Sequence, residues 1–141
     1  MKPEQFIREY GVEKAKEVVE GAPEGATHYG LSQYRQWEGR ILKTFTEGSW
    51  RSTAVFGGNL RFIEDDCLKI QDLKRLVESL DIINELGSLR SAKANVREMY
   101  ADSSCDYVHP EARLYDYKHL RVGRVIKAIR DHESIYGGGD E

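Results

Sequence analysis

The chain has 141 residues, of which 40% are hydrophobic and 32% are charged, which is enough apolar material for one modest folded core. Its 21 basic and 24 acidic side chains give a formal net charge of −3. This near-neutral balance excludes a basic field over the whole protein for holding nucleic acid, and it argues against a mimic of DNA, which needs a dense excess of carboxylates.

No part of the sequence approaches the roughly 18–20 consecutive apolar residues of a membrane-spanning helix. The opening residues 1–6 lack the apolar core of a signal peptide, so secretion is not expected. Cys67 and Cys105 are predicted to be reduced thiols. These features predict a cytoplasmic protein.

The N-terminal part, residues 1–25, has the pattern of two short helices. Pro3 and Glu4 suit a first helical turn, and Gly11 suits a helix end because glycine reaches the left-handed conformation at low cost. In residues 12–20 the apolar positions recur at helical spacing. A helical pair is therefore expected before residue 25.

Residues 26–64 are rich in aromatic and β-branched side chains punctuated by glycine, which is typical of strands joined by tight turns. Strand-like runs cover residues 32–37, 40–46 and 49–56, and a fourth short strand is expected at an edge over residues 60–63. This segment predicts a small antiparallel meander of three to four strands.

Helical spacing returns from residue 69. An apolar stripe runs to Leu86, Gly87 suits the end of that helix, and Ser88 is a natural N-cap for the next one. The patterns predict a helical hairpin over residues 69–101, an irregular segment over 102–116, a last helix over 117–136 and a flexible tail over 137–141.

These segments predict an α+β fold in a single domain, residues 1–141. The meander is flanked by the N-terminal helical pair and by a C-terminal set of about three helices.

The meander is the one locally basic segment, because residues 25–62 hold five basic side chains and two acidic ones. It also carries most of the chain's large aromatic rings, and Trp, Tyr and Arg dominate the energetics of protein interfaces. We expect a binding surface made of Tyr34, Arg35, Trp37, Arg40, Lys43, Trp50 and Arg51. The alternative is that the rings pack inward on helices, which a sheet covered on one side requires.

The same basic and aromatic side chains would suit single-stranded nucleic acid, with cations against phosphates and rings stacked on bases. The signature of RNA-recognition domains is absent from the sequence. Nucleic-acid binding is therefore kept as the second hypothesis.

The apolar stripe of the first C-terminal helix suits an interface between copies of the chain. Its members, spaced three and four residues apart, are Leu73, Leu76, Leu80 and Ile83. We predict a homo-oligomer that uses them, because a domain of this size often buries leftover apolar surface in a dimer. Core packing of the stripe against the sheet is the alternative, and both can hold in the same protein.

No metal site and no cofactor are predicted. Cys105 and His109 form one loose pair, whereas zinc sites usually take about four ligands in two close pairs. Residues 57–59 are interpreted as a turn and not as a phosphate cradle, because the residues that follow look like a strand and not a helix.

No enzyme is predicted either. The acids at 64–66 raise the pKa of Cys67, which is the wrong direction for a nucleophile. The neighbours in 131–133 point in different directions on a helix, so they make no orienting pair. Catalysis is the third hypothesis, and it would need a pocket that holds His109, His119 or His132 beside an acid.

Two stretches carry a family resemblance: residues 2–11 running on through 20–29, and residues 72–79 with the joint at 86–89. They resemble mosaic accessory proteins encoded in the early regions of lambda-like phages and prophages of enteric bacteria. The resemblance implies life in the cytoplasm of an infected or lysogenic bacterium. It also implies non-catalytic binding to a host or phage protein, in host takeover, anti-defence or regulation, and it supplies no site residues.

Overall fold

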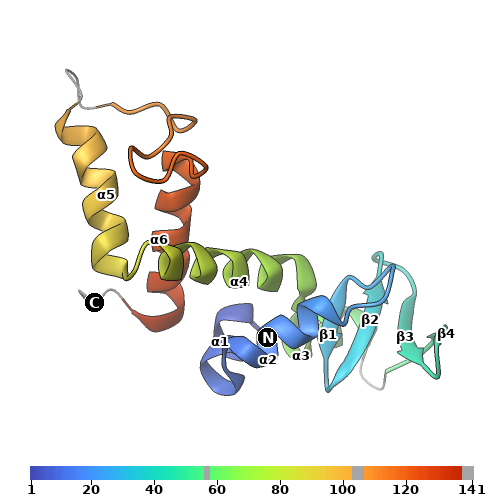
Figure 1. Ribbon diagram of the computed structural model, residues 1–141. Helices are drawn as coiled ribbons and strands as arrows, with labels where there is room; N and C mark the ends of the chain where they lie inside the picture. The colour runs from blue at the N-terminus through green and yellow to red at the C-terminus, as the bar shows by residue number, and fades with distance from the viewer. Residues whose placement is uncertain (56–57, 103–106, 138–141) are drawn as a thin grey trace. The chain divides into compact units, whose positions relative to one another are not determined.

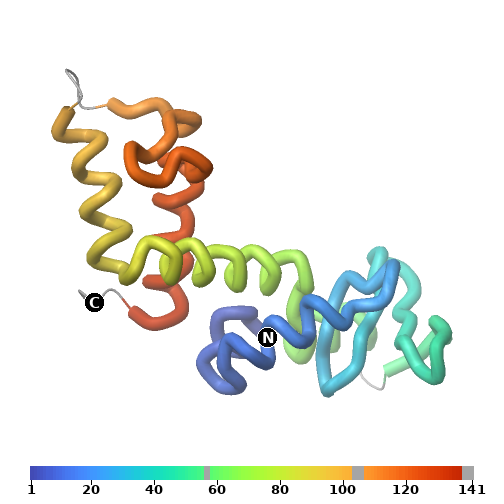
Figure 2. The backbone as a smooth tube through the Cα atoms, viewed as in Figure 1, coloured from blue at the N-terminus to red at the C-terminus, as the bar shows by residue number. Residues whose placement is uncertain are grey.

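The structure is a computed structural model that describes residues 1–55, 58–102 and 107–137 (Figures 1 and 2). The predicted α+β class is confirmed, since the described residues form six helices and a five-stranded antiparallel sheet. Where the sequence predicts one domain, the chain divides into two compact units, Met1–Arg75 and Leu76–Glu141. Each unit is described by itself.

The first unit opens with the predicted helical pair, α1 (Pro3–Tyr10) and α2 (Val12–Glu20). Gly11 separates them with φ of +88°, a backbone conformation that glycine adopts without strain. Each helix buries two apolar side chains, Phe6 and Ile7 in α1 and Ala15 and Val18 in α2.

The sheet of the first unit has five short strands in the order β4-β3-β2-β1-β5. Their bounds are β1 (His28–Gly30), β2 (Gln33–Trp37), β3 (Leu42–Thr46), β4 (Ser49–Ser52) and β5 (Leu68–Lys69). β2, β3 and β4 confirm the three predicted strands of the meander, and all pairings are antiparallel. β1 and β5 were not predicted, because runs of three and two residues are too short to show an alternating pattern.

The predicted fourth strand over residues 60–63 is wrong, because this segment belongs to a helix, α3 (Asn59–Asp66). The adjacent Phe62 and Ile63 are both buried while Leu60 is exposed, which fits a helical face and not an alternating strand. A helix, and not a strand, therefore follows directly after Gly58. Asn59 Oδ1 accepts a hydrogen bond from the backbone N–H of Val55 at 3.0 Å, so the start of the helix is tied to the chain before it.

α3 packs on the sheet through a small core of buried side chains. Leu42 of β3 belongs to one buried cluster with Phe62 and Ile63 of α3 and with Cys67. Half-buried Trp37 and Val55 pack against the same cluster. One face of the sheet is therefore covered by a helix that the sequence pattern did not predict.

The second unit is helical. Its helices are the later part of α4 (Ile70–Glu85), α5 (Leu89–Ala101) and α6 (Val122–Tyr136). Ser88 is the predicted N-cap of α5, because its Oγ accepts a hydrogen bond from Ser91 N at 3.1 Å. α5 packs alongside α6 (Figure 1).

The last helix begins at Val122, five residues after its predicted start. The residues before it form an irregular loop, tied by a bridge between Arg113 and Arg121. This loop holds Leu114 and Leu120 in the apolar core of the unit, together with Ile83, Leu89 and the buried face of α6.

The predicted oligomer interface is not on the surface. Its four members are at most 5% exposed within the chain: Leu73, Leu76, Leu80 and Ile83. The stripe therefore forms the buried apolar face of an amphipathic helix, and these four side chains are not available to a second copy of the chain.

The predicted strand over 49–56 is too long, because β4 ends at Ser52 and residues 53–55 are not in a strand. The thiol of Cys105 and the tail from residue 138 lie outside the described residues. Within the described ranges, no helix combines the length and apolar character needed to cross a bilayer.

Candidate functional site

The two faces of the sheet divide the predicted binding surface. Side chains alternate along a strand, and the register places Arg35, Thr44 and Arg51 in one row across β2, β3 and β4. Trp37 lies two residues from Arg35 and shares that face.

Tyr34, Lys43 and Trp50 lie on the opposite face with Phe45, and Arg40 lies between β2 and β3. The seven predicted residues therefore do not form one patch.

Arg35 is a buried structural residue, which corrects its assignment to the binding surface. Its side chain is 5% exposed, and its Nη1 donates to Thr44 Oγ1 at 2.8 Å. Nη2 donates to the carbonyl oxygen of Gly30 at 3.3 Å and to Gln33 Oε1 at 3.2 Å. The guanidinium group donates these hydrogen bonds within the first unit, because a buried charge is costly unless it is hydrogen-bonded.

Tyr34 and Trp50 are half-buried and hold neighbouring backbone against the sheet. The Tyr34 hydroxyl donates to the carbonyl oxygen of Val18 at 2.7 Å, and Trp50 Nε1 donates to that of Glu24 at 3.1 Å. Burial raises the pKa of Tyr34, which favours the protonated hydroxyl that donates this hydrogen bond. The end of α2 and the chain after it thus lie over this face, as the inward-packing alternative expected for the rings.

The surface that remains accessible lies at the β3–β4 end of the sheet. Phe45 and Trp50 are half-buried and their ring centroids are 5.2 Å apart, with Lys43 beside them on the same face. Arg51 is exposed on the other face and lies 3.4 Å from Glu47. Phe45 is not among the predicted site residues, although its position two residues from Lys43 places both on one face of a strand.

β4 is also an edge of the sheet. The N–H of Thr53 donates to the carbonyl oxygen of Leu42 at 2.8 Å, so this group points toward β3. Because N–H groups alternate in direction along a strand, those of Trp50 and Ser52 point away from β3. Among the described residues no strand pairs with this outer side, and Ser49, Arg51 and Ser52 are exposed. We call this surface the β4 edge: it consists of the backbone of Trp50 and Ser52 and the side chains of Trp50 and Arg51.

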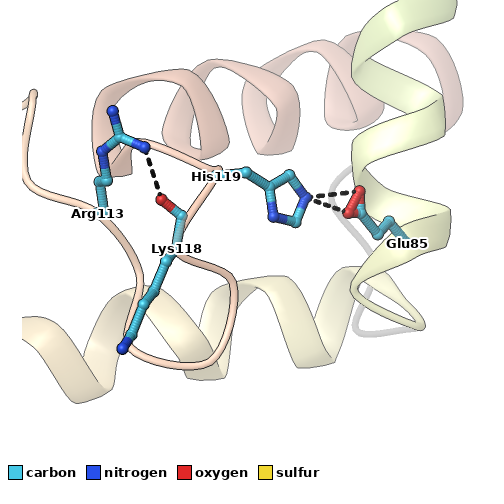
Figure 3. A network of polar contacts seen from close by, with 4 residues as sticks. All are labelled: Glu85, Arg113, Lys118 and His119. Atoms are coloured by element: carbon cyan, nitrogen blue, oxygen red, sulfur yellow. Dashed lines mark hydrogen bonds and ion pairs between the residues drawn. The ribbon is translucent and has the colours of Figure 1, made fainter.

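The three histidines of the catalytic hypothesis have different surroundings, and His119 contacts an acid. His119 Nε2 lies 2.6 Å from Glu85 Oε2 (Figure 3). His109 Nδ1 accepts a hydrogen bond from Glu111 N at 3.1 Å, and His132 is buried on α6. The described part of the chain contains no group of three or more His, Cys, Asp or Glu side chains able to hold a metal ion.

Cys67 is 3% exposed, and its environment keeps the thiol protonated. Burial, with a smaller contribution from Asp66, raises the pKa of Cys67 to about 11. The predicted direction is confirmed, but the main cause is burial and not the neighbouring acids. Cys67 is therefore a packing residue and not a nucleophile.

No known protein family matches the chain, and it has no significant match among the curated proteins or the solved structures with which it was compared.

Proposed function

We propose that the protein is a non-catalytic binding protein that takes an extended segment of a partner protein onto the β4 edge. The observation that carries this proposal is the position of β4 at the end of the sheet, with backbone donors directed outward and exposed residues along the strand. An extended peptide that adds to such an edge gains main-chain hydrogen bonds for affinity. Each contributes about 0.5–1.5 kcal/mol net.

Specificity comes from the side chains on the two faces of β4. A partner strand beside it has alternating side chains, one set next to the Phe45–Trp50 ring pair and the other next to Arg51. The matching segment is therefore apolar at one set of positions and acidic at the other. Trp and Arg are the side chains that most often carry interface binding energy.

The family resemblance gives this proposal its setting. The partner is a host or phage protein met in the cytoplasm of a bacterium, and the binding serves host takeover, anti-defence or regulation. A reacting group is not required, because the β4 edge acts by shape, backbone hydrogen bonding and charge.

The test uses two substitutions at one position. A partner is first captured from a bacterial lysate and identified by mass spectrometry, and its affinity is then measured with both proteins purified. Ser52→Pro removes the outward N–H and blocks the edge, so affinity falls at least tenfold. Ser52→Ala keeps the N–H and binds like the natural protein.

Circular dichroism and thermal unfolding of both variants show whether the fold is kept, which is expected because Ser52 N–H does not bond to β3. Equal affinity of the Pro and Ala variants, with both folded, would contradict the proposal.

A further inference from the structure

The second unit carries a concentration of positive charge that the overall balance hides. Residues 112–130 hold six basic side chains and a single acidic one, Asp116. The six are Arg113, Lys118, Arg121, Arg124, Lys127 and Arg130. Acidic residues before and after this segment cancel it when the whole C-terminal part is counted, which is why the charge pattern of the sequence pointed to the sheet instead.

A groove of about 480 Å³ lies along this segment. Its lining includes Arg121, Arg124 and Lys127 of α6 or its cap, together with His119 of the preceding loop. Glu111 is the acidic member of the lining, and it forms an ion pair with Arg121 at 2.9 Å. Both side chains of that pair are more than half exposed, so the pair contributes little stability and exchanges readily for another anion.

The start of α6 is not free to hold a single phosphate through its amides. The N–H of Val122 donates to the carbonyl oxygen of Ala112 at 2.8 Å, and that of Gly123 donates to Pro110 at 2.9 Å. Arg124 is directed inward, since its Nη1 donates to the buried Ser79 Oγ at 3.0 Å. The groove therefore does not direct several donors toward one small anion.

The exposed cations are instead spread along the groove. Arg121, the N-cap of α6, and Lys127 within the helix are six residues apart, or roughly 9 Å along the helix axis. That separation spans more than one phosphate of a polynucleotide: in a duplex the charges of one strand follow each other by about 3.4 Å along the helix axis. The arrangement fits a chain of phosphates better than a single one.

The loop before α6 adds the ring of His119, which can stack on a nucleic-acid base. His119 has a side chain that is 63% exposed, and its ring centroid lies 6.5 Å from that of Tyr117. Figure 3 shows His119 between the Arg113–Lys118 contact of the same loop and Glu85 of α4. An exposed His ring can stack on a base in single-stranded recognition, and the half-buried Tyr117 lies behind it against the core.

From this combination we propose that the groove beside α6 binds a polynucleotide through its backbone phosphates. The site lies in the unit that does not contain the β4 edge, so it is a second binding activity, independent of partner-protein capture. It also moves nucleic-acid binding away from the sheet, where Arg35 is buried and Tyr34 and Trp50 are bonded to backbone carbonyls.

The experiment measures fluorescence anisotropy of a labelled single-stranded DNA, and of the matching duplex, with the full chain at low salt. We expect binding that weakens steeply as salt rises. Arg121→Gln combined with Lys127→Gln weakens it at least tenfold and lowers the slope of log affinity against log salt by about 1–2. Arg90→Gln is the matched control, because it removes an exposed charge from α5 of the same unit and leaves the affinity unchanged.

Three results would each overturn the proposal. One is the absence of binding to either DNA at low salt, including the case in which anionic lipid vesicles bind instead. Another is full affinity in the folded double variant. The third is an equal loss in Arg90→Gln, which would show a bulk charge effect and no site. Lys127→Gln alone, which leaves the Arg121–Glu111 pair in place, repeats the comparison if the double variant is misfolded.

Discussion

The guanidinium carbon of Arg35 lies 4.9 Å from the centre of the Phe62 ring, so a charged side chain of β2 is stacked on the helix that covers the sheet. The same side chain bonds to β3 through Thr44. Arg35 thus ties three elements of the first unit together. Its position explains why a basic residue in the middle of the meander contributes to the fold and not to the surface.

Replacement of Arg35 by Ala is expected to lower the free energy of unfolding by about 2–4 kcal/mol, because it leaves buried acceptors without a donor and opens a cavity over Phe62. Arg40→Ala is the control, since Arg40 is exposed and its loss is expected to cost no more than about 0.5 kcal/mol. Urea unfolding followed by circular dichroism measures both. Similar values for the two variants would contradict the structural role of Arg35.

Gly30 is placed where no side chain fits. A Cβ at this position would lie 2.5 Å from Cys67 Sγ and 2.7 Å from the carbonyl oxygen of Asp66. Gly30→Ala is therefore expected to destabilise the first unit by about 1–3 kcal/mol or more. Cys67→Ala in the same chain should recover part of the loss, and a double-mutant cycle by thermal unfolding measures the coupling. Strictly additive effects would show that the two residues do not touch.

The buried thiol of Cys67 gives a second, chemical measurement. Cys105→Ser leaves Cys67 as the one thiol of the chain. Because burial raises the pKa of Cys67 to about 11, a disulfide reagent at mildly alkaline pH is expected to modify it slowly in the folded protein and rapidly in urea. Rapid modification without denaturant would mean that this side of α3 is open.

His28 makes the stability of the first unit depend on pH. Burial lowers the pKa of His28, as does the charge of Lys69, while Asp72 acts in the opposite direction. The folded state therefore binds the proton less well than the unfolded state, whose histidine titrates near about pH 6.5. The contribution of His28 to the free energy of unfolding is fully present above that pH. It is lost as the pH drops from there toward the lower pKa of the folded state.

The measurement compares the free energy of unfolding at about pH 7.5 and about pH 5.5, on either side of the unfolded histidine pKa. The natural protein is expected to lose stability at the lower pH, and His28→Gln is expected to lose less. An identical pH dependence in the variant would assign the effect to another group.

The parts of the fold that the sequence predicted are those in which local pattern and burial agree. The paired helices before residue 21, the cap at Ser88 and the three longer strands all follow from nearby residues. α3 was missed because its few apolar residues, taken singly, fit alternation as well as helical spacing. β5 was missed because two residues are too few to show the alternating pattern of a strand.

The candidate site was harder to predict, for a physical reason. Which face of a strand is covered depends on elements distant in sequence: Arg35 is buried by Phe62, and Trp50 is held by the carbonyl of Glu24. Composition pointed to the segment that contains the proposed β4 edge, but it could not show which face of the sheet each side chain occupies. The basic groove was missed because charge was counted over long segments and not over the loop and helix that the fold brings together.

The most direct test of the proposed function is amide hydrogen exchange of the purified protein with and without its captured partner. In the free protein the outward N–H groups of Trp50 and Ser52 should exchange quickly, whereas the Thr53 N–H, bonded to Leu42, should be protected. Addition of the partner is predicted to protect Trp50 and Ser52 and to leave the exchange of α6 unchanged. Protection that appears elsewhere while Trp50 and Ser52 still exchange freely would contradict binding at the β4 edge.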